Sequence, residues 1–466
     1  MFRPLLPLIR RLHFYAGILI APFLLVATVS GGLYALAPTA EQFVYRDLLH
    51  SDSAGPPHTI ADQVAAVRAT HDAVTVTAVD AAAAPGQTTR VYLADDSLGD
   101  SQRRTVFVDP GSARILGETV TYGSNGALPL RTWIDHLHRD LHLGDAGRLY
   151  SETAASWLWV VALGGLVLWI ARFRTRRRNT GESWWRVGTV ARSGTRRTRT
   201  LNWHGAVGLW LVVGLVFLSA TGLTWSRYAG ENIAELRSQL SWQRPSLPTV
   251  LPVAHQHHTG AHPGGEAPTP SAPTPSAPTI VEDRLDAITT IARDHGVDGR
   301  VEISLPTDPS DAVTVTQTRL PWRYSSNAVA IDPTTLAVTA ELPFASWSWP
   351  AKLTDWAIQL HMGILFGWVS ALALVILAAA LTTVIVRGYL MWWRRGPATR
   401  PGRAPSRGTW RTAVASSGWG TRLGFAALVA TTAAVGWFVP LLGIPLAAFL
   451  VGDALIGRVR DRSPVR

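Results

Sequence analysis

Residues 10–36 read RRLHFYAGILIAPFLLVATVSGGLYAL, in which two arginines and a histidine introduce a long apolar run. A helix of about 20 apolar residues crosses the roughly 30 Å hydrocarbon core of a bilayer, so this stretch predicts a membrane span over about 12–36. Further apolar runs of sufficient length predict spans at about 154–170, 203–225 and 356–386.

A last apolar run, 423–456, is broken by Pro440, Gly443 and Pro445 and predicts a helical hairpin of two shorter spans. The expected total is about six spans. The composition agrees, because 47% of the 466 residues are hydrophobic, only 16% are charged and the mean hydropathy is +0.14. These values exclude a disordered chain and argue against an ordinary soluble enzyme.

The chain contains no cysteine. This excludes disulfides, thiolate zinc sites, Cys-ligated iron–sulfur clusters and covalent attachment of a c-type haem. Any metal must therefore be held by histidine, carboxylate, methionine or tyrosine.

The formal net charge of +11 comes almost wholly from arginine, since Lys352 is the only lysine. A pI near 10.7 can indicate nucleic-acid binding, but these arginines cluster beside the apolar runs, mainly within 172–199 and 387–403. By the positive-inside rule, these clusters share the cytoplasmic side when both termini are cytoplasmic. The long segments 37–135 and 227–350 then lie outside. We expect the lipid bilayer, and no nucleic acid, as a partner.

An alternative interpretation of the N-terminus is a cleavable secretory signal, because basic residues and an apolar run precede the sequence ALAPTA. The run is long for a signal peptide, and it matches an internal span. We therefore expect it to be retained.

The first and third predicted spans share a pattern at fixed spacing. His13 is followed by Gly17 and by the pair Ser30-Gly31, and His204 is followed at the same offsets by Gly208 and the pair Thr221-Gly222. This pattern predicts an internal duplication that relates the two halves of the chain.

The second and fourth spans repeat in the same way, at a larger offset. Leu137-His138 precedes Gly144 by the spacing at which Leu360-His361 precedes Gly367. The difference between the two offsets corresponds to about 32 extra residues, mostly a His/Pro-rich insertion in the second half. We therefore expect a duplicated four-helix core plus the C-terminal hairpin.

The duplication pairs four histidines by depth. His13 and His204 lie at the cytoplasmic ends of their helices, whereas His138 and His361 lie at the outer ends. Imidazoles on facing helices can supply the two axial ligands of a b-type haem, so two haems are expected across the bilayer. A single histidine at a span end is more often an interfacial residue, but four at equivalent positions favour ligands.

Two other histidines are weaker candidates for the outer site. His136 aligns with Gln359 and His142 with Leu365, so neither has an equivalent in the other repeat. We rank both below His138.

The two outer segments each predict a small α+β domain. A helical pattern at 59–69 precedes alternating runs at 73–79, 89–94 and 105–110 in the first segment. The second segment has a helical pattern at 279–295, runs at 300–305, 312–318 and 328–339, and an Asp-Pro turn like that of the first. Neither contains a nucleophile elbow, a P-loop, an HExxH motif or a dinucleotide-binding glycine motif.

The His/Pro-rich insertion contains His255, His257, His258 and His262, which could bind copper or zinc weakly. The competing interpretation, a solvated Pro/Thr/Ser linker, is the one we favour.

Several of these stretches resemble one known family. The segments 10–36, 137–161, 202–223 and 360–374 are similar to PepSY-associated transmembrane proteins, and the outer segments resemble PepSY domains. The ending PLLGIPLAAFLVGDALI, 440–456, resembles the final helix of that family. The resemblance implies a bacterial cytoplasmic membrane protein. It covers nearly the whole chain.

That family includes iron-regulated membrane proteins and ferric-siderophore reductases with two b-type haems, so the resemblance implies His13, His204, His138 and His361 as haem ligands. The implied activity is electron transfer to an extracytoplasmic ferric siderophore or other iron chelate. No flavin or nicotinamide motif is present, so the donor would be a cytoplasmic protein or a quinol. The insertion departs from the family pattern and leaves the chelate open.

Two other functions remain alternatives. One is a non-redox PepSY protein that binds or regulates an extracytoplasmic peptidase or cell-envelope partner. The other is an iron or copper permease, for which the spans lack suitably spaced polar residues.

The fold class we expect is a membrane α-helical bundle with two small α+β extracytoplasmic domains. The expected boundaries are a first span within 1–36, domain 1 at 37–130, a second span with an outer amphipathic segment at 131–172, a basic loop at 173–200, a third span at 201–226, domain 2 at 227–350 with its linker at 254–279, a fourth span at 351–395, a loop at 396–420, the hairpin at 421–458 and a cytoplasmic tail at 459–466.

Overall fold

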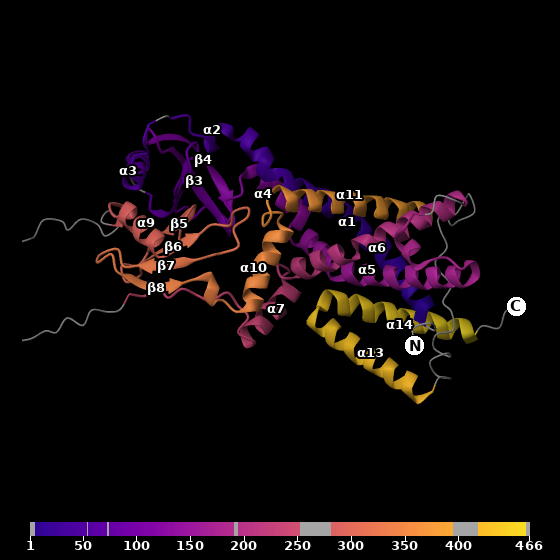
Figure 1. Cartoon of the computed structure of the whole chain (residues 1–466). Helices are drawn as coiled ribbons and strands as arrows, with labels where there is room; N and C mark the ends of the chain where they lie inside the picture. Colours follow the sequence, from indigo (N-terminus) through magenta and orange to yellow (C-terminus); the bar gives the residue numbers. More distant parts are fainter. Residues whose placement is uncertain are drawn as a thin grey trace, which may run out of the picture. The chain divides into compact units, whose positions relative to one another are not determined.

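The computed structural model describes residues 5–53, 55–71, 74–190, 194–251, 281–394 and 418–462. The chain forms two compact units (Figure 1). We call them the membrane unit, made from 1–35, 134–243 and 357–466, and the sheet unit, made from 36–133 and 244–356. The linker 254–279 with its four histidines, most of the loop 396–420 and half of the tail 459–466 lie outside the described residues.

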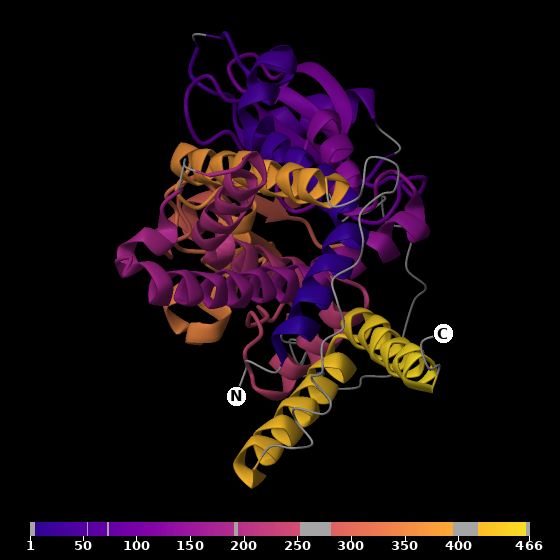
Figure 2. The ribbon, with the colours of Figure 1, turned by 90° about the vertical axis from the view of Figure 1, so that its right-hand side faces the viewer.

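Four helices of the described chain are long and apolar enough to cross a bilayer, which confirms that this is a membrane protein. They are α1 (Leu6–Val44), α5 (Gly144–Thr180), α6 (Arg196–Leu223) and α11 (Trp368–Trp393). Within the membrane unit α6 packs against both α5 and α11 (Figures 1 and 2).

The fourth span starts later than the sequence predicts. A helix over 356–386 is expected, but α10 (Trp349–His361) ends at His361 and α11 begins at Trp368. Gly363 and Gly367 between them have φ of 77° and 53°, in the left-handed region that only glycine adopts without strain. His361 therefore lies at the end of a separate short helix.

The second span has the same arrangement. α4 (Pro129–Arg139) carries His138 in its last turn, and α5 begins after a turn in which Leu141, His142 and Gly144 have φ between 55° and 57°. This agrees with the amphipathic segment expected before the span. Each outer histidine is thus held on a short helix ahead of its long one.

The C-terminal hairpin consists of α13 (Trp419–Phe438) and α14 (Pro440–Arg462). Gly436 and Gly443 lie in direct contact, which brings the two helices together. A buried ion pair between Arg11 of α1 and Asp453 of α14 joins the hairpin to the rest of the membrane unit. Both helices contain shorter apolar stretches than the four long ones, so six spans remain a prediction.

Helix α1 contains Pro22, which has no N–H to donate to the carbonyl of Ile18. The hydroxyl of Tyr389 on α11 donates to that carbonyl at 3.0 Å. On the next residue, Tyr150 of α5 donates to the Leu19 carbonyl at 2.7 Å and accepts from the amide of Phe23 at 3.4 Å. Two tyrosines thus repair the backbone around the proline, as an apolar surrounding requires.

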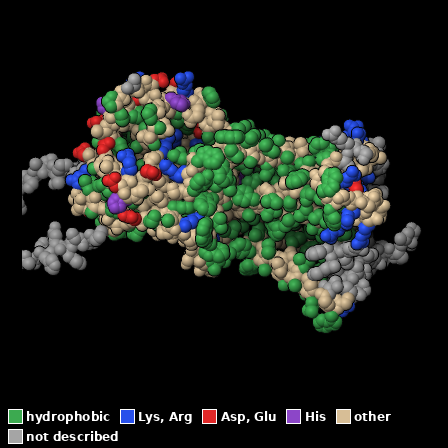
Figure 3. All heavy atoms as spheres, viewed as in Figure 1, with side chains coloured by type: hydrophobic (Ala, Val, Ile, Leu, Met, Phe, Trp, Pro, Cys, Tyr) green, Lys and Arg blue, Asp and Glu red, His purple; other side chains and the backbone are tan. Residues whose placement is uncertain are grey.

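The membrane unit has an apolar surface with an arginine-rich end (Figure 3). Trp210 and Val213 on α6 are each 76% exposed, which suits lipid contact better than water. The exposed arginines of α5, α6 and α11 gather where α5 and α11 end and α6 begins. They are Arg172, Arg174, Arg177, Arg178, Arg196, Arg197, Arg199 and Arg394.

The sheet unit contains one antiparallel sheet of eight strands in the order β4-β3-β2-β1-β5-β6-β7-β8. The strands are β1 (Val76–Asp80), β2 (Thr89–Leu93), β3 (Gln102–Asp109), β4 (Arg114–Tyr122), β5 (Val301–Ser304), β6 (Val313–Gln317), β7 (Ala328–Ile331) and β8 (Val338–Leu342). Each predicted alternating run overlaps a strand, and the run 328–339 contains β7 and the start of β8. None of the predicted runs covers β4. The Asp-Pro turns join β3 to β4 and β7 to β8.

The sequence predicts two separate outer domains, but the structure joins them into one. Strand β1 pairs with β5 through Val79 and Ile303, both fully buried. Helices α3 (Ile60–Thr70) and α9 (Leu285–Asp294) contribute to one hydrophobic core shared by both halves. The carboxylate of Asp286 on α9 also accepts from the Ile60 amide at the start of α3, at 3.0 Å. Each half would otherwise leave a strand edge and an apolar face uncovered.

The remaining short elements are α2 (Arg46–Leu49), α7 (Tyr228–Gln239) and the 3₁₀ helices Trp184–Gly188 and Phe344–Ser346. Helix α7 was expected in the second outer domain but belongs to the membrane unit. There, the amide of Asn232 donates to the Phe438 carbonyl at the end of α13 at 2.8 Å.

Candidate functional site

Two of the predicted histidines meet inside the membrane unit. The rings of His13 on α1 and His204 on α6 have their centroids 6.3 Å apart, with their planes at 78°. The two side chains come from equivalent positions of the first and third spans, as the repeat predicts.

The spacing of this inner pair matches two imidazoles that share one metal. A metal–imidazole nitrogen bond is about 2.0–2.1 Å long, so rings whose centroids lie 6.3 Å apart would leave room for one metal ion between them. Neutral imidazole is also a favoured ligand of iron.

Each ring of the inner pair is anchored by a backbone carbonyl. His13 donates from Nδ1 to the Val161 carbonyl on α5 at 2.9 Å, and His204 donates from Nδ1 to the Val384 carbonyl on α11 at 2.9 Å. A carbonyl only accepts, so Nδ1 must carry the proton, and the lone pair of the neutral ring stays on Nε2. The bond therefore fixes both the tautomer and the ring orientation, as partners of metal-binding histidines do.

A glycine lies beside each of these anchors, and at Gly165 the imidazole leaves no room for a larger side chain. Gly165 and Gly388 follow Val161 and Val384 by four residues, one helical turn onward on the same face. A methyl group at Gly165 would lie 2.9 Å from Cε1 of His13, whereas one at Gly388 would lie 3.6 Å from Cε1 of His204. Each imidazole thus lies against a glycine, one helical turn after the carbonyl that it contacts.

The outer histidines are anchored by hydroxyl groups. His138 Nδ1 lies 3.1 Å from Ser30 Oγ on α1, and His361 Nδ1 lies 2.6 Å from Thr221 Oγ1 on α6. The Ser30 hydroxyl also lies 2.8 Å from the Val26 carbonyl. Because a hydroxyl has one proton to donate and a carbonyl only accepts, the imidazole donates to the oxygen. Nε2 is again left with the lone pair.

The same pattern holds for Thr221, whose hydroxyl donates to the Phe217 carbonyl at 2.8 Å. His361 also packs edge-on against Trp225, with ring centroids 5.2 Å apart.

Glycines lie beside the outer rings as well. A methyl group at Gly31 would lie 3.1 Å from Cε1 of His138, and one at Gly222 would lie 3.8 Å from Cε1 of His361. The sequence placed both glycines in the repeat, and the structure shows that they accommodate an imidazole.

The two layers of histidines are separated along the helices. The number of residues from His13 to Ser30 on α1 equals the number from His204 to Thr221 on α6. At about 1.5 Å per residue, this stretch is about 26 Å long, close to the thickness of a hydrocarbon core.

Space is present one turn beyond each inner histidine. Beyond the adjacent residues and the nearby backbone of its own helix, a methyl group at Gly17 or at Gly208 would meet no atom of the described chain within 4 Å. The two glycines are equivalent in the repeat and lie one helical turn after His13 and His204. The residues present therefore suit a flat group between the imidazoles.

The weaker candidates are arranged differently. His136 hydrogen-bonds Asp140 at 3.2 Å, and its ring lies 5.8 Å from that of the exposed His142. This placement does not test whether His136 and His142 are weaker candidate ligands than His138, so that ranking stays a prediction. Across the described ranges, no group of three or more His, Asp or Glu side chains could hold a metal ion, and His255, His257, His258 and His262 lie outside those ranges.

Sequence reasoning did not identify the partners of the four Nδ1 atoms. Ser30 and Thr221 were part of the repeat, so the spacing held a signal for them. The carbonyls of Val161 and Val384 could not be identified from the sequence, because every residue has a backbone carbonyl. The nearby Gly165 and Gly388, at equivalent positions of the second and fourth spans, were the one available signal.

Comparison with known families gives one match. The model of the PepSY-associated TM region matches residues 10–395, which include all four histidines. No curated protein matches the chain significantly.

Proposed function

Because the chain belongs to the family of the PepSY-associated TM region, which covers most of its length, we propose that it is a transmembrane di-haem b electron-transfer protein. Its substrate would be an extracytoplasmic ferric chelate, such as a siderophore, reduced for iron acquisition. The observation that carries the proposal is the 6.3 Å separation of the His13 and His204 rings.

The number of ligands favours haem over a bare metal ion. Each layer supplies two imidazoles, and in the part of the chain that the structure describes no third His, Asp or Glu completes a metal-binding group. A structural zinc takes about four protein ligands, whereas haem iron takes only axial ligands from the protein.

The contacts also support the proposed duplication. The carbonyls that anchor His13 and His204 stand at equivalent positions of the second and fourth spans. The hydroxyls that anchor His138 and His361 stand at equivalent positions of the first and third spans. Each repeat thus uses its own long helices to orient equivalent rings, and the membrane unit would hold one haem at each layer.

In this proposal, bound haem supplies one-electron chemistry. The protein's own contribution is to hold Nε2 of each ring unprotonated through the Nδ1 bond, to fix the ring by helix packing and to exclude water with apolar helices. The layers lie near opposite faces of the bilayer, so electrons would cross it between them.

The orientation follows from charge. The arginine-rich end of the membrane unit would face the cytoplasm of a bacterium, with both termini inside and the sheet unit outside. The donor would then be a cytoplasmic protein or a quinol near His13 and His204, and the chelate would be reduced near His138 and His361. Reduction releases iron because hard-oxygen chelators bind ferrous iron far more weakly than ferric iron.

The first test is a dithionite-reduced minus oxidised visible spectrum of the purified full-length protein, with haem measured per chain. We expect b-type bands and about two haems per chain. Replacing His138 or His361 with alanine should leave about one haem, whereas H136A and H142A should keep two.

Electron transfer is tested in proteoliposomes with a reductant enclosed and a ferric chelate outside. We expect ferrous iron to form outside with the intact protein and not with H13A. A colourless protein expressed with ample haem would contradict the proposal. It would favour the non-redox alternative, a PepSY protein that binds an envelope partner.

A further inference from the structure

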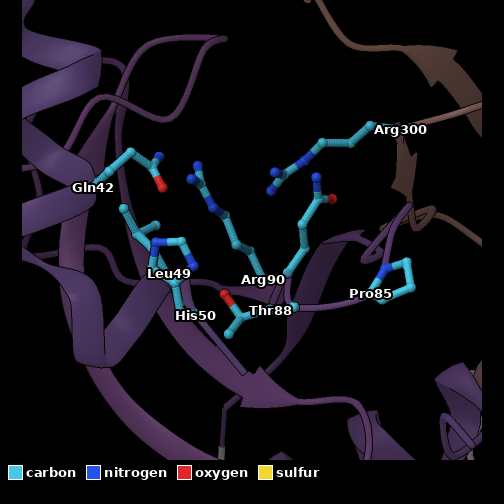
Figure 4. A pocket seen from close by; sticks show the side chains of 9 residues that line it. Gln42, Leu49, His50, Pro85, Thr88, Arg90 and Arg300 are labelled. Carbon is cyan, nitrogen blue, oxygen red and sulfur yellow. The ribbon is translucent and has the colours of Figure 1, made fainter. Parts of the chain in front are cut away.

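The sheet unit contains a cavity of about 260 Å³ that the proposed electron transfer does not use (Figure 4). Arg90 of β2 and Arg300, just before β5, extend toward the same space from the two halves of the sheet. Thr88 and Leu49 form buried parts of the wall, and Gln42 and His50 lie at its exposed side.

The two guanidinium groups differ in their charge compensation. Arg300 donates from Nε and Nη2 to the Asp80 carboxylate, at 2.7 and 2.9 Å. Arg90 has no carboxylate within 4.0 Å among the described residues, and Nη1 donates only to the Gly126 carbonyl, at 3.3 Å. Its Nε is buried without a hydrogen-bond partner in that part of the chain.

The neighbouring charges leave a positive excess. Glu41 lies near Arg90 but is paired with Arg131 at 3.3 Å, and Glu302 is paired with Arg103 at 2.9 Å. Each nearby carboxylate therefore already has an arginine partner. An anion in the cavity would compensate this excess charge through the end of the Arg90 guanidinium group, which extends into the space (Figure 4).

We propose that this cavity binds a small oxyanion, carried by a soluble carboxylate or phosphate, through Arg90 and Arg300. The planar fork of arginine matches the two oxygens of either group. The cavity volume of about 260 Å³ is large enough for a small polycarboxylate or a phosphate. The inference is independent of haem binding.

The test is calorimetric titration of the full-length protein in detergent with iron-free citrate and, separately, with inorganic phosphate. We expect binding of at least one anion, weakened by salt. R90Q should weaken it about tenfold or more. R293Q removes an exposed arginine of α9 and should bind like the unaltered protein.

Arg90 also lies over the ring of Phe107, so R90Q could perturb folding. R90K keeps the charge but loses the fork, and it should bind more weakly than the unaltered protein while melting at a similar temperature. Hydrogen exchange of residues 85–90 in the unaltered protein gives a second readout, in which we expect protection when the anion is added.

Three outcomes would overturn the proposal. They are no binding of either anion at low millimolar concentration, equal binding by R90Q and R293Q, and hydrogen exchange at 85–90 that neither anion changes. Lipid headgroups are the other source of phosphate. Protection at 85–90 that occurs in phosphatidylglycerol nanodiscs without free anion, but not in phosphatidylcholine nanodiscs with citrate or phosphate, would also overturn a soluble ligand.

Discussion

The hydroxyl of Tyr389 donates to the carbonyl of Ile18 at 3.0 Å, and this is the carbonyl that Pro22 leaves without its helical partner. The two residues are 371 positions apart in the chain. A proline inside a membrane helix is thus compensated by a side chain from another helix.

Removing that hydroxyl tests the compensation. In Y389F the Ile18 carbonyl loses its partner in apolar surroundings, and we expect a loss of about 1–3 kcal/mol in stability. The measurement is thermal unfolding in detergent. Y228F alters a tyrosine that is 42% exposed and should melt like the unaltered protein. Equal melting of the two variants would contradict the proposed role.

The glycines beside the inner histidines differ in how closely they approach. In G165A the new methyl group would lie 2.9 Å from His13, so the ring must move, and we expect haem per chain to fall from about two toward one. G388A places its methyl group 3.6 Å from His204, an ordinary contact, and should retain both haems. Equal losses in both variants would refute the steric explanation.

The hydroxyl anchor of His361 can be removed with little change of volume. In T221V the Nδ1 proton loses its acceptor at 2.6 Å, and we expect the haem affinity of the outer layer to fall by about 10–100-fold. The measurement is the rate and extent of haem transfer to an apoprotein acceptor. The control is T382V, which removes a hydroxyl that donates only to a carbonyl of its own helix. Its haem affinity should equal that of the unaltered protein.

Asp109, the last residue of β3 and the first of the Asp-Pro turn, makes the stability of the sheet unit depend on pH. Burial would raise the pKa of this carboxyl, but hydrogen bonds from Ser51, Ser53, Ser112 and the Gly111 amide outweigh it and hold the pKa at about 2, below the ordinary 3.8. A lowered pKa stabilises the fold above the unfolded value, and this stabilisation is lost as the pH falls from about 4 to 2. Chemical unfolding at several pH values should show that the free energy of unfolding falls less steeply with acid in D109N than in the unaltered protein. An equally steep fall would contradict this role of Asp109.

The pairing of β1 with β5 predicts that the sheet unit unfolds as one body. Ile303 is fully buried at this junction, and I303A should cost about 2–5 kcal/mol. Hydrogen exchange should then increase in β2 and β7 together. V338A, in the edge strand β8, should have a smaller effect. Increased exchange confined to the β5–β8 half would instead indicate two independent domains.

Local patterns in the chain predicted much of this structure. The long apolar runs located all four long helices, although the helices α1 and α5 extend well beyond the predicted spans at both ends. Alternating residues such as those of 312–318 predicted the strands. The equal spacing after His13 and His204 selected the two rings that meet. These inferences worked because hydrophobic length, strand alternation and repetition are properties of a few neighbouring residues.

The break between α10 and α11 was missed for a related reason. Gly363 and Gly367 stand in an apolar run, where hydropathy outweighs the helix-breaking signal of glycine. The joined sheet was missed because each half has the pattern of a complete small domain, and nothing local shows that β1 pairs with β5.

The sequence by itself determined that this is a membrane protein with long apolar helices, and its repeated spacing singled out four histidines. Only the tertiary structure decided which carbonyl or hydroxyl orients each ring, and it also brought Arg90 and Arg300 to one cavity. The physical reason is that burial and periodicity act along a segment, whereas hydrogen-bond partners and charge balance depend on side chains that meet only when distant segments pack.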